Sequence, residues 1–354
     1  MTSLNLLLVA LLSFQEADVR WLSEVTTPPK SVTSNASVTR RPLLQSNDGK
    51  AITQPEQWAA RRVEIERAWN EFLGPMPPRP TSGYEVIRTD SLEKVDRHRI
   101  RYECEPQLFV EAYLLVPKGV SKAPGIVAFH QTTSNTIDQI AGVAGPGEQA
   151  IGLQLAERGF VVMCPRCFLW ENAPSLNDAV KRFKERHPKS LGMMKMLYDA
   201  QRAVDILQSA PQCQKGRVGA IGHSLGAKEV LYLAAFDQRI AAAVASEGGV
   251  TFASTNWDAP WYLGPTIRQP EFARNHHELL ALIAPRPFLV LGGEQGRGAA
   301  DGDRSWQVIA PAQDVSRVLN QSVRVGLLNH GKGHSIPSDA FEKSVEWLKT
   351  YIQP

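Results

Sequence analysis

The sequence has few cysteines, no cluster of basic residues and no apolar run long enough to span a membrane, and each absence excludes a class of protein. Only 4 of the 354 residues are cysteine. Cys164 and Cys167 have C-x-x-C spacing, but a zinc ribbon would need a second such pair. The 39 basic residues nearly balance the 36 acidic ones, and no basic run predicts a nucleic acid partner.

The longest apolar run lies at the N-terminus, over residues 4–14. It fits the core of a signal peptide and is too short for a transmembrane helix. We predict a signal peptide over residues 1–17, export to the periplasm or the outside, and no stable membrane anchor. The alternative is a cytoplasmic protein with an apolar N-terminus. Residues 18–50, rich in Ser, Thr, Pro and Asn from residue 25 on, are predicted to be a linker.

Hydrophobic periodicity divides the rest of the chain into a helical extension, residues 51–80, and a larger domain, residues 81–354. Helical spacing covers residues 55–73, and antiparallel strands are expected at 84–88, 98–103 and 108–116. Strands and helices then alternate, which predicts an α/β fold with a mainly parallel central sheet and helices on both faces. The predicted strands are 125–130, 160–164, 217–221, 240–246, 287–293 and 323–329. The predicted helices are 148–159, 192–209, 225–236, 276–283 and 337–351.

The motif that points to chemistry is Gly222-His223-Ser224-Leu225-Gly226, between a predicted strand and a predicted helix. In a nucleophile elbow a serine occupies a sharp strand-to-helix turn whose neighbours must be small. The two glycines meet this requirement, because a Cβ atom at either position would crowd the adjacent strand or helix. The alternative is a glycine-rich turn in which Ser224 only caps the helix. The position after a strand favours Ser224 as a nucleophile.

A serine nucleophile needs a base and an acid, which in this architecture follow it in the order acid, histidine. The predicted base is His334, in "NHGKGHSIP" after the last strand. Two positions remain open for the acid. Glu247 ends the strand that follows the serine's helix, where an unpaired carboxylate would be costly. Asp301, with Glu294 and Asp303 near it, follows the next strand.

Negative charge that develops on the substrate oxygen needs two hydrogen-bond donors. We expect these to be the backbone N–H of Leu225 and that of Gln131, in the loop after "GIVAFH". Lys228 lies one helical turn beyond Ser224, so its side chain is expected to point back towards the serine and a substrate pocket. The alternative is a lysine that extends to solvent.

Further candidates for substrate binding are aromatic side chains and one histidine. Trp257 and Trp261, in "STNWDAPWYLG", could stack on a sugar ring; the alternative is that they fold their own loop over the core. His130 ends the strand "GIVAFH" and faces the same edge of the predicted sheet. For His130, too, a packing role is the alternative.

These residues resemble the glucuronoyl esterases, a family of carbohydrate esterases. The resemblance lies in the elbow, in Lys228 one turn after it, and in Glu247 at the end of the following strand. The segments "AFHQTT", "GHSLGAKEVLYLAAFD" and "NHGKGHS" are similar more broadly to dienelactone-hydrolase-like and acetyl-xylan-esterase-like α/β-hydrolases. The resemblance implies an α/β-hydrolase fold, Glu247 as the triad acid and Lys228 as a ligand of a sugar acid. Leu225 departs from it, because glucuronoyl esterases usually have arginine directly after the nucleophile.

We therefore predict a serine ester hydrolase that uses no metal or other cofactor and acts through an acyl-enzyme. The predicted partner is a small-molecule or polysaccharide carbohydrate ester. The nearest alternatives are an acetyl esterase, a dienelactone-hydrolase-like enzyme or a general carboxylesterase. A peptidase of the same fold and a carbohydrate-binding protein without activity are more distant hypotheses. The sequence leaves the oligomeric state open.

Overall fold

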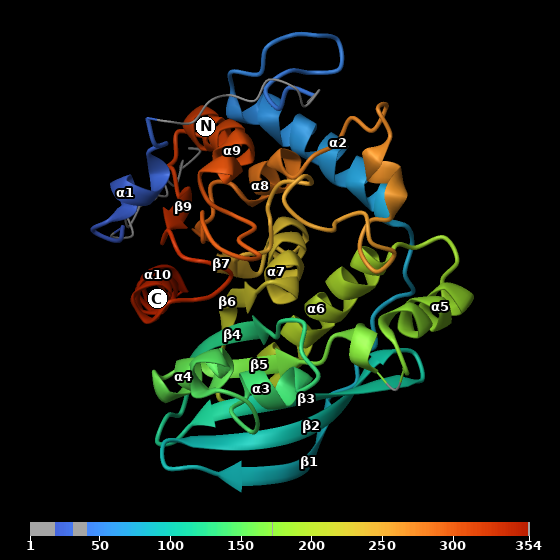
Figure 1. Ribbon diagram of the computed structural model, residues 1–354, viewed down its shortest axis with the longest axis vertical. Coiled ribbons are helices and arrows are strands. Elements are labelled where there is room, and N and C mark those ends of the chain that lie inside the picture. Colours follow the sequence, from blue (N-terminus) through green and yellow to red (C-terminus); the bar gives the residue numbers. More distant parts are fainter. Residues whose placement is uncertain (1–17, 31–40, 172, 353–354) are drawn as a thin grey trace, which may run out of the picture.

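One sheet runs through the part of the protein that the computed structural model describes, which is residues 18–30, 41–171 and 173–352. Within these residues nine strands pair in the order β1-β2-β3-β5-β4-β6-β7-β8-β9 (Figure 1). Antiparallel pairing joins β1 to β2, β2 to β3 and β3 to β5. Along the rest of the sheet, β5-β4-β6-β7-β8-β9, adjacent strands are parallel, which confirms the predicted fold class.

The strand bounds agree with the predicted segments to within a few residues at most ends. The exceptions are β1, β2 and β6, each of which extends further than the sequence indicated. The strands are β1 (Tyr84–Ser91), β2 (Val95–Glu105), β3 (Leu108–Pro117), β4 (Ala123–Phe129), β5 (Val161–Pro165), β6 (Cys213–His223), β7 (Ile240–Ser246), β8 (Phe288–Gly292) and β9 (Val325–Asn329).

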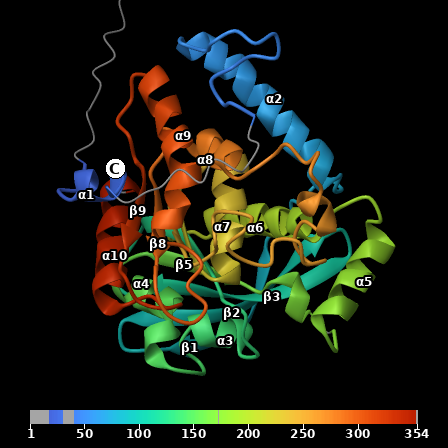
Figure 2. The same ribbon diagram turned by 45° about the horizontal axis from the view of Figure 1, so that its top comes forward.

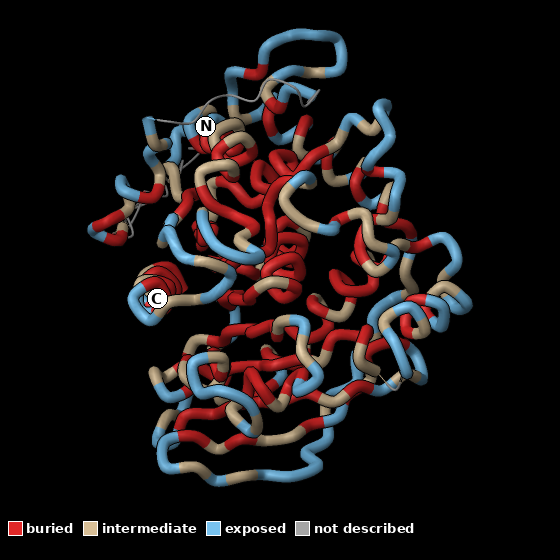
Figure 3. Tube along the Cα trace, in the orientation of Figure 1, coloured by how far each residue is buried: buried red, intermediate tan, exposed pale blue. Residues whose placement is uncertain are grey.

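Helices cover both faces of the sheet, and the buried apolar side chains accordingly form two clusters. On one face lie α6 (Gly192–Ser209) and α7 (Leu225–Phe236), and on the other α4 (Ile151–Glu157) and α10 (Ser338–Ile352). Alternate residues of β4 serve the two faces: Val127 belongs to the first cluster and Ile126 to the second. The central strands are therefore buried on both sides, whereas β1 lies exposed at the edge (Figure 3).

The remaining helices extend these two layers. On the α7 side are α2 (Pro55–Leu73), α5 (Leu176–Arg186), α8 (His277–Ile283) and α9 (Trp306–Val318), and on the α10 side α1 (Leu22–Thr26) and α3 (Thr136–Ile140). The predicted extension is not a separate unit, because α2 contacts α8 and α9 (Figure 2). Its Trp69 is fully buried and donates from Nε1 to Glu278 Oε2 at 2.7 Å.

The predicted linker, residues 18–50, is wrong for residues 18–30, which pack along the edge strand β9. Trp21 stacks on Trp347 with ring centroids 5.6 Å apart, and its Nε1 donates to Glu346 Oε2 at 2.9 Å. Asp18 pairs with Arg324 at 2.6 Å. The composition misled because the polar residues that suggest a linker begin only after these anchors. Residues 31–40, like the predicted signal peptide 1–17, lie outside the described residues.

Two further features concern the cysteines and the length of the helices. All four cysteines are free and buried, so Cys164 and Cys167 form no disulfide with each other. In the ranges that the structure describes, no helix is both long and apolar enough to cross a membrane.

We predict that Trp21→Ala lowers the free energy of unfolding by about 3 kcal/mol, because it removes a large buried side chain and a hydrogen bond. Denaturant unfolding measures this difference. Val63→Ala on the exposed side of α2, where Val63 is 63% exposed, is the control and should change stability by less than about 0.5 kcal/mol. Equal stability of the two variants would mean that residues 18–30 are a linker after all.

Candidate active site

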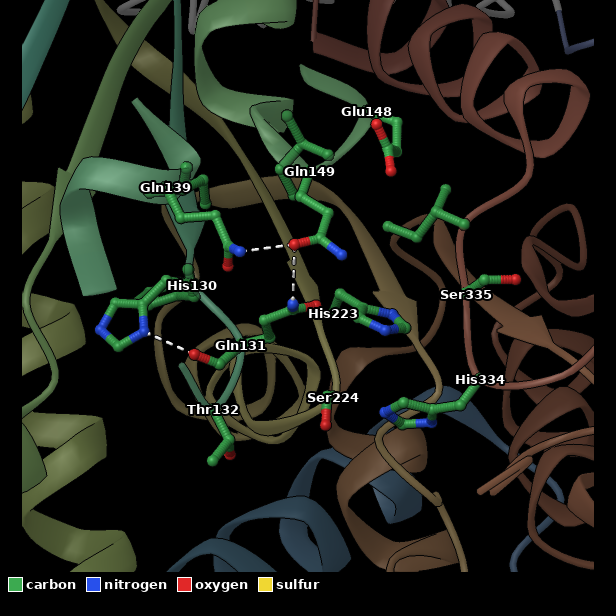
Figure 4. A pocket seen from close by; sticks show the side chains of 14 residues that line it. His130, Gln131, Thr132, Gln139, Glu148, Gln149, His223, Ser224, His334 and Ser335 are labelled. Atoms are coloured by element: carbon green, nitrogen blue, oxygen red, sulfur yellow. Dashed lines mark hydrogen bonds between the residues drawn. The ribbon is translucent and has the colours of Figure 1, made fainter. Parts of the chain in front are cut away.

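Most of the predicted catalytic residues lie at the carboxyl ends of neighbouring parallel strands. Gln131 follows β4, Ser224 follows β6, Glu247 follows β7 and His334 lies in the loop after β9. Parallel strands end at the same edge of a sheet, so these loops meet there. Ser224, His334, Gln131 and His223 all line one cavity at this edge (Figure 4).

The turn at Ser224 has the geometry that the sequence predicted for a nucleophile elbow. Ser224 has φ 57° and ψ −114°, a strained conformation for a residue with a side chain. Its backbone N–H donates to Ser246 O at 2.8 Å, which fixes the turn against β7. A Cβ atom at Gly222 would lie 2.4 Å from the carbonyl carbon of Gly226, and one at Gly226 would lie 2.4 Å from Phe129 O. Both positions therefore require glycine.

Glu247 is the carboxylate that faces His334. Its Oε2 lies 3.6 Å from His334 Nδ1, and it accepts a hydrogen bond from the backbone N–H of Ala300 at 2.5 Å. Glu247 is fully buried and has φ 55°, a left-handed conformation that is costly for glutamate. Its Oε1 has no hydrogen-bond partner within the described residues. The buried carboxylate thus retains capacity to accept the Nδ1 proton of the imidazole, which would leave Nε2 free to act as a base.

Asp301, the second candidate for the acid, has a different place. Its two carboxylate oxygens accept from the backbone N–H groups of Gly249 and Val250, both at 2.8 Å, and from Ser305 Oγ at 2.9 Å. Both oxygens therefore face the loop after β7, and in the described part of the chain Asp301 makes no ion pair with His334. Its acceptor sites are already used to hold the loop that follows Glu247, so the geometry favours Glu247 over Asp301 as the acid.

His223, directly before the serine, packs on His334 with ring centroids 4.6 Å apart. Its Nδ1 is hydrogen-bonded to Ser246 Oγ at 3.0 Å. Burial above all, together with the neighbouring histidines His334 and His330, lowers the pKa of His223 to about 3. His223 is thus neutral at ordinary pH, so it supports the ring of His334 without opposing its protonation.

The expected oxyanion donors lie at the ends of two elements. Leu225 is the first residue of α7, where a backbone N–H has no acceptor within the helix and the helix dipole is positive. Gln131 follows β4, and His130 holds its carbonyl through a hydrogen bond from Nδ1 at 2.8 Å. The Nε2 of His130 accepts from the backbone N–H of Cys167 at 3.1 Å. With both nitrogens used and its pKa lowered to about 4 by burial, His130 positions the loop. It also lines the cavity at Ser224, so its role in substrate binding stays a prediction.

Lys228 is buried beside the serine and does not extend to solvent. Its Nζ donates to Gly248 O at 2.6 Å and to Thr255 Oγ1, and lies 4.0 Å from the centre of the Trp257 ring. Burial lowers the pKa of Lys228 to about 7, although the charge of Asp301 acts in the opposite direction. The ammonium therefore has two of its three N–H groups committed and one left.

Trp257 does not form a substrate rim, as the sequence had suggested. It is fully buried, and its Nε1 donates to Gly249 O at 2.6 Å. Its face instead lies under the Lys228 ammonium, a favourable arrangement of a cation on an aromatic ring. Trp261 is only partly buried and lines a cavity with Lys228, so this candidate stays a prediction.

Two cavities of about 290 Å³ each meet at the nucleophile, and both contain Thr132, Ser224 and His334. The first, here called the lysine cavity, is also lined by Leu176, Leu225, Lys228, Glu247, Thr255, Asn256, Trp261 and Tyr262. The second, the glutamine cavity, is also lined by Gln131, Gln139, Glu148, Gln149, His223 and Ile336. No sequence motif indicated Thr132, Gln139, Gln149 or Asn256. The only signal for them was the number of polar residues in the loops after two predicted strands.

Comparisons with known proteins agree with this architecture. The sequence model of the dienelactone hydrolase family matches residues 110–270. The putative hydrolase YtaP of Bacillus subtilis (strain 168) is 31% identical over 277 residues, which are 75% of this chain and 87% of that protein. A glucuronoyl esterase from Solibacter usitatus superposes with a TM-score of 0.72 at 18% identity, over 89% of this chain and 99% of that one. A glucuronoyl esterase from Teredinibacter turnerae T7901 gives 0.70 at 20% identity, over 91% of each chain.

We predict that Glu247→Gln lowers kcat by up to about 10⁴-fold, because it removes the charge that orients and stabilises the His334 imidazolium. Asp301→Asn is the matched comparison. It should lower stability by about 1–3 kcal/mol, since its amide would face backbone N–H groups, and should lower kcat far less. The kcat of both variants is measured with phenyl acetate below their unfolding temperatures, and denaturant unfolding measures the stability of Asp301→Asn. A larger loss in the folded Asp301→Asn variant than in Glu247→Gln would reverse the assignment.

Proposed function

The chain belongs to the dienelactone hydrolase family and is a carboxylic ester hydrolase, and we propose that it cleaves esters of sugar acids through an acyl-enzyme on Ser224. The proposal rests above all on one observation: the strained Ser224 and the buried Lys228 line the same cavity of about 290 Å³. The structures that superpose on it and are named glucuronoyl esterases support the same substrate class.

In the proposed reaction each of these side chains has one role. Ser224 Oγ attacks the ester carbonyl while His334 takes its proton, and the Glu247 carboxylate stabilises the imidazolium that forms. The backbone N–H groups of Leu225 and Gln131 donate hydrogen bonds to the carbonyl oxygen as it becomes negatively charged. His334 then gives its proton to the leaving alcohol. Water enters, loses a proton to His334 and releases the acid from Ser224.

The lysine cavity fits the acid part of such an ester. A simple acetyl group offers only a methyl group, which would leave the polar lining of this cavity without partners. A sugar ring carries hydroxyls for Lys228 and Asn256 and an apolar face for Trp261. Leu225 adds no positive side chain beside the oxyanion, so the backbone donors act there without help from a guanidinium.

The direct test compares hydrolysis of benzyl glucuronate and phenyl acetate by the wild type and by Ser224→Ala. The proposal expects wild-type hydrolysis of both esters, a higher kcat/KM for the glucuronate ester, and no hydrolysis by the variant. Cleavage of phenyl acetate alone would leave a serine esterase and reject the sugar acid. Activity of Ser224→Ala equal to the wild type would reject the serine mechanism.

We further predict that Lys228→Met raises KM for benzyl glucuronate by about tenfold and leaves kcat/KM for phenyl acetate within about twofold. Methionine fills a similar space but donates no hydrogen bond, and a charge-assisted bond contributes roughly 1.5–3 kcal/mol. Lys181→Met, at an exposed lysine of α5, is the control. A rise in KM shared by both substrates would show that Lys228 only maintains the fold of the site.

We also predict that KM for benzyl glucuronate depends on pH through the protonation of Lys228. Because the pKa of Lys228 is lowered to about 7, the side chain loses its charge as the pH rises through neutrality, and its hydrogen bond to the substrate weakens. KM for benzyl glucuronate should therefore rise above about pH 7 in the wild type and stay flat in Lys228→Met. A KM that does not change with pH in the wild type would contradict this role.

A further inference from the structure

The glutamine cavity meets the lysine cavity at Ser224, is not lined by Lys228 and has no part in the binding of the acid proposed above. An ester places two groups on its carbonyl carbon, and Thr132, Ser224 and His334 belong to both cavities. Ser335 and Ile336, which follow His334 in the chain, line the glutamine cavity and not the lysine cavity. Since His334 must protonate the leaving oxygen, the cavity that follows its loop is the place for the alcohol.

A network of three glutamine side chains forms the polar wall of this cavity. Gln149 Oε1 accepts from Gln139 Nε2 at 2.5 Å and from Gln131 Nε2 at 3.3 Å (Figure 4). Gln139 is only 5% exposed, and its amide lines the cavity. Because both bonds end on the oxygen of Gln149, the Gln149 NH₂ group remains to donate to a ligand. The amide oxygens of Gln131 and Gln139 remain to accept.

The charge of the lining restricts the ligand further. Among the described residues, no lysine or arginine lines the glutamine cavity, and the one carboxylate there, that of Glu148, would repel an anion. Ile140, Ile151 and Ile336 supply an apolar part of the wall. This combination fits an uncharged group with an apolar ring face and several hydroxyls, each of which both donates and accepts a hydrogen bond.

We propose that the glutamine cavity binds the leaving alcohol and selects an uncharged, polyhydroxylated alcohol of about one sugar ring over an apolar alcohol of similar shape. An apolar alcohol would cover the three amides and leave their donors and acceptors without partners, which is the arrangement that polar sites reject most strongly. This inference rests on the acyl-enzyme mechanism proposed above but not on the identity of the acid.

The test measures where the acyl group goes when an alcohol competes with water. The acetyl-enzyme formed from phenyl acetate is offered glucose or cyclohexylmethanol at equal concentration, and both acetylated products are counted. An alcohol that accepts the acyl group uses the subsite from which a leaving alcohol departs. The wild type should transfer acetyl to glucose about tenfold better than to cyclohexylmethanol.

Two variants and a control assign the preference to the glutamines. Gln149→Glu keeps the two accepted hydrogen bonds and removes the NH₂ donors, and Gln149→Leu removes the whole polar group. Both should bring the ratio of the two products close to one while hydrolysis of phenyl acetate continues. Gln321→Leu, at an exposed glutamine outside the cavity lining, should keep the wild-type ratio.

The outcomes separate this inference from the proposed function. A wild type that transfers to neither alcohol, or prefers cyclohexylmethanol, overturns the alcohol subsite. A glucose preference that survives in both Gln149 variants overturns the assignment to the glutamine network. Failure of wild type to form any acetyl-enzyme overturns the serine mechanism and the subsite together. Failure to cleave benzyl glucuronate when phenyl acetate, whose alcohol is also apolar, is cleaved rejects only the sugar acid.

Discussion

The buried carboxylate of Glu247 is the contact on which the arrangement of the site depends. Glu247 follows β7 directly, in a left-handed conformation. It faces His334, which lies in the loop after β9, and accepts from the backbone N–H of Ala300 in the loop after β8. Asp301, in the loop after β8, in turn accepts hydrogen bonds from the backbone N–H groups of Gly249 and Val250 in the loop after β7. A buried carboxylate is costly without partners. The contacts of Glu247 therefore fix the loops after β7, β8 and β9 relative to one another. The position of the base is thus a consequence of how this charge is accommodated.

The two cavities that meet at the nucleophile offer different hydrogen-bonding groups to a ligand. In the lysine cavity one cation is buried against an aromatic ring, and burial lowers its pKa to about 7. In the glutamine cavity neutral amides are fixed by hydrogen bonds to one another. Both arrangements are preorganised, since Lys228 and Gln149 already have partners without a ligand. We infer that the site distinguishes the acid and the alcohol of its ester by these two linings.

Much of the fold was predictable from the sequence, because strands buried on both faces give unbroken apolar runs and the elbow has a local signature. The helix α5 was missed because its apolar stripe is narrow between charged residues, and α9 because Pro311 lies inside it. The site was predictable where it depends on one turn, as at Ser224. The site was not predictable where loops far apart in sequence meet. Neither the choice of Glu247 over Asp301 nor the burial of Trp257 follows from any local pattern.

The most direct measurement of the central claim is intact-protein mass spectrometry after reaction with a fluorophosphonate, with the modified peptide identified by fragmentation. A serine activated by His334 and Glu247 reacts stoichiometrically with such a reagent, whereas an ordinary serine does not. We expect one adduct per chain, located on Ser224, and none in His334→Ala. Absence of an adduct on the folded wild-type protein, or an adduct on another residue, would contradict the assignment of Ser224, His334 and Glu247 as one catalytic unit.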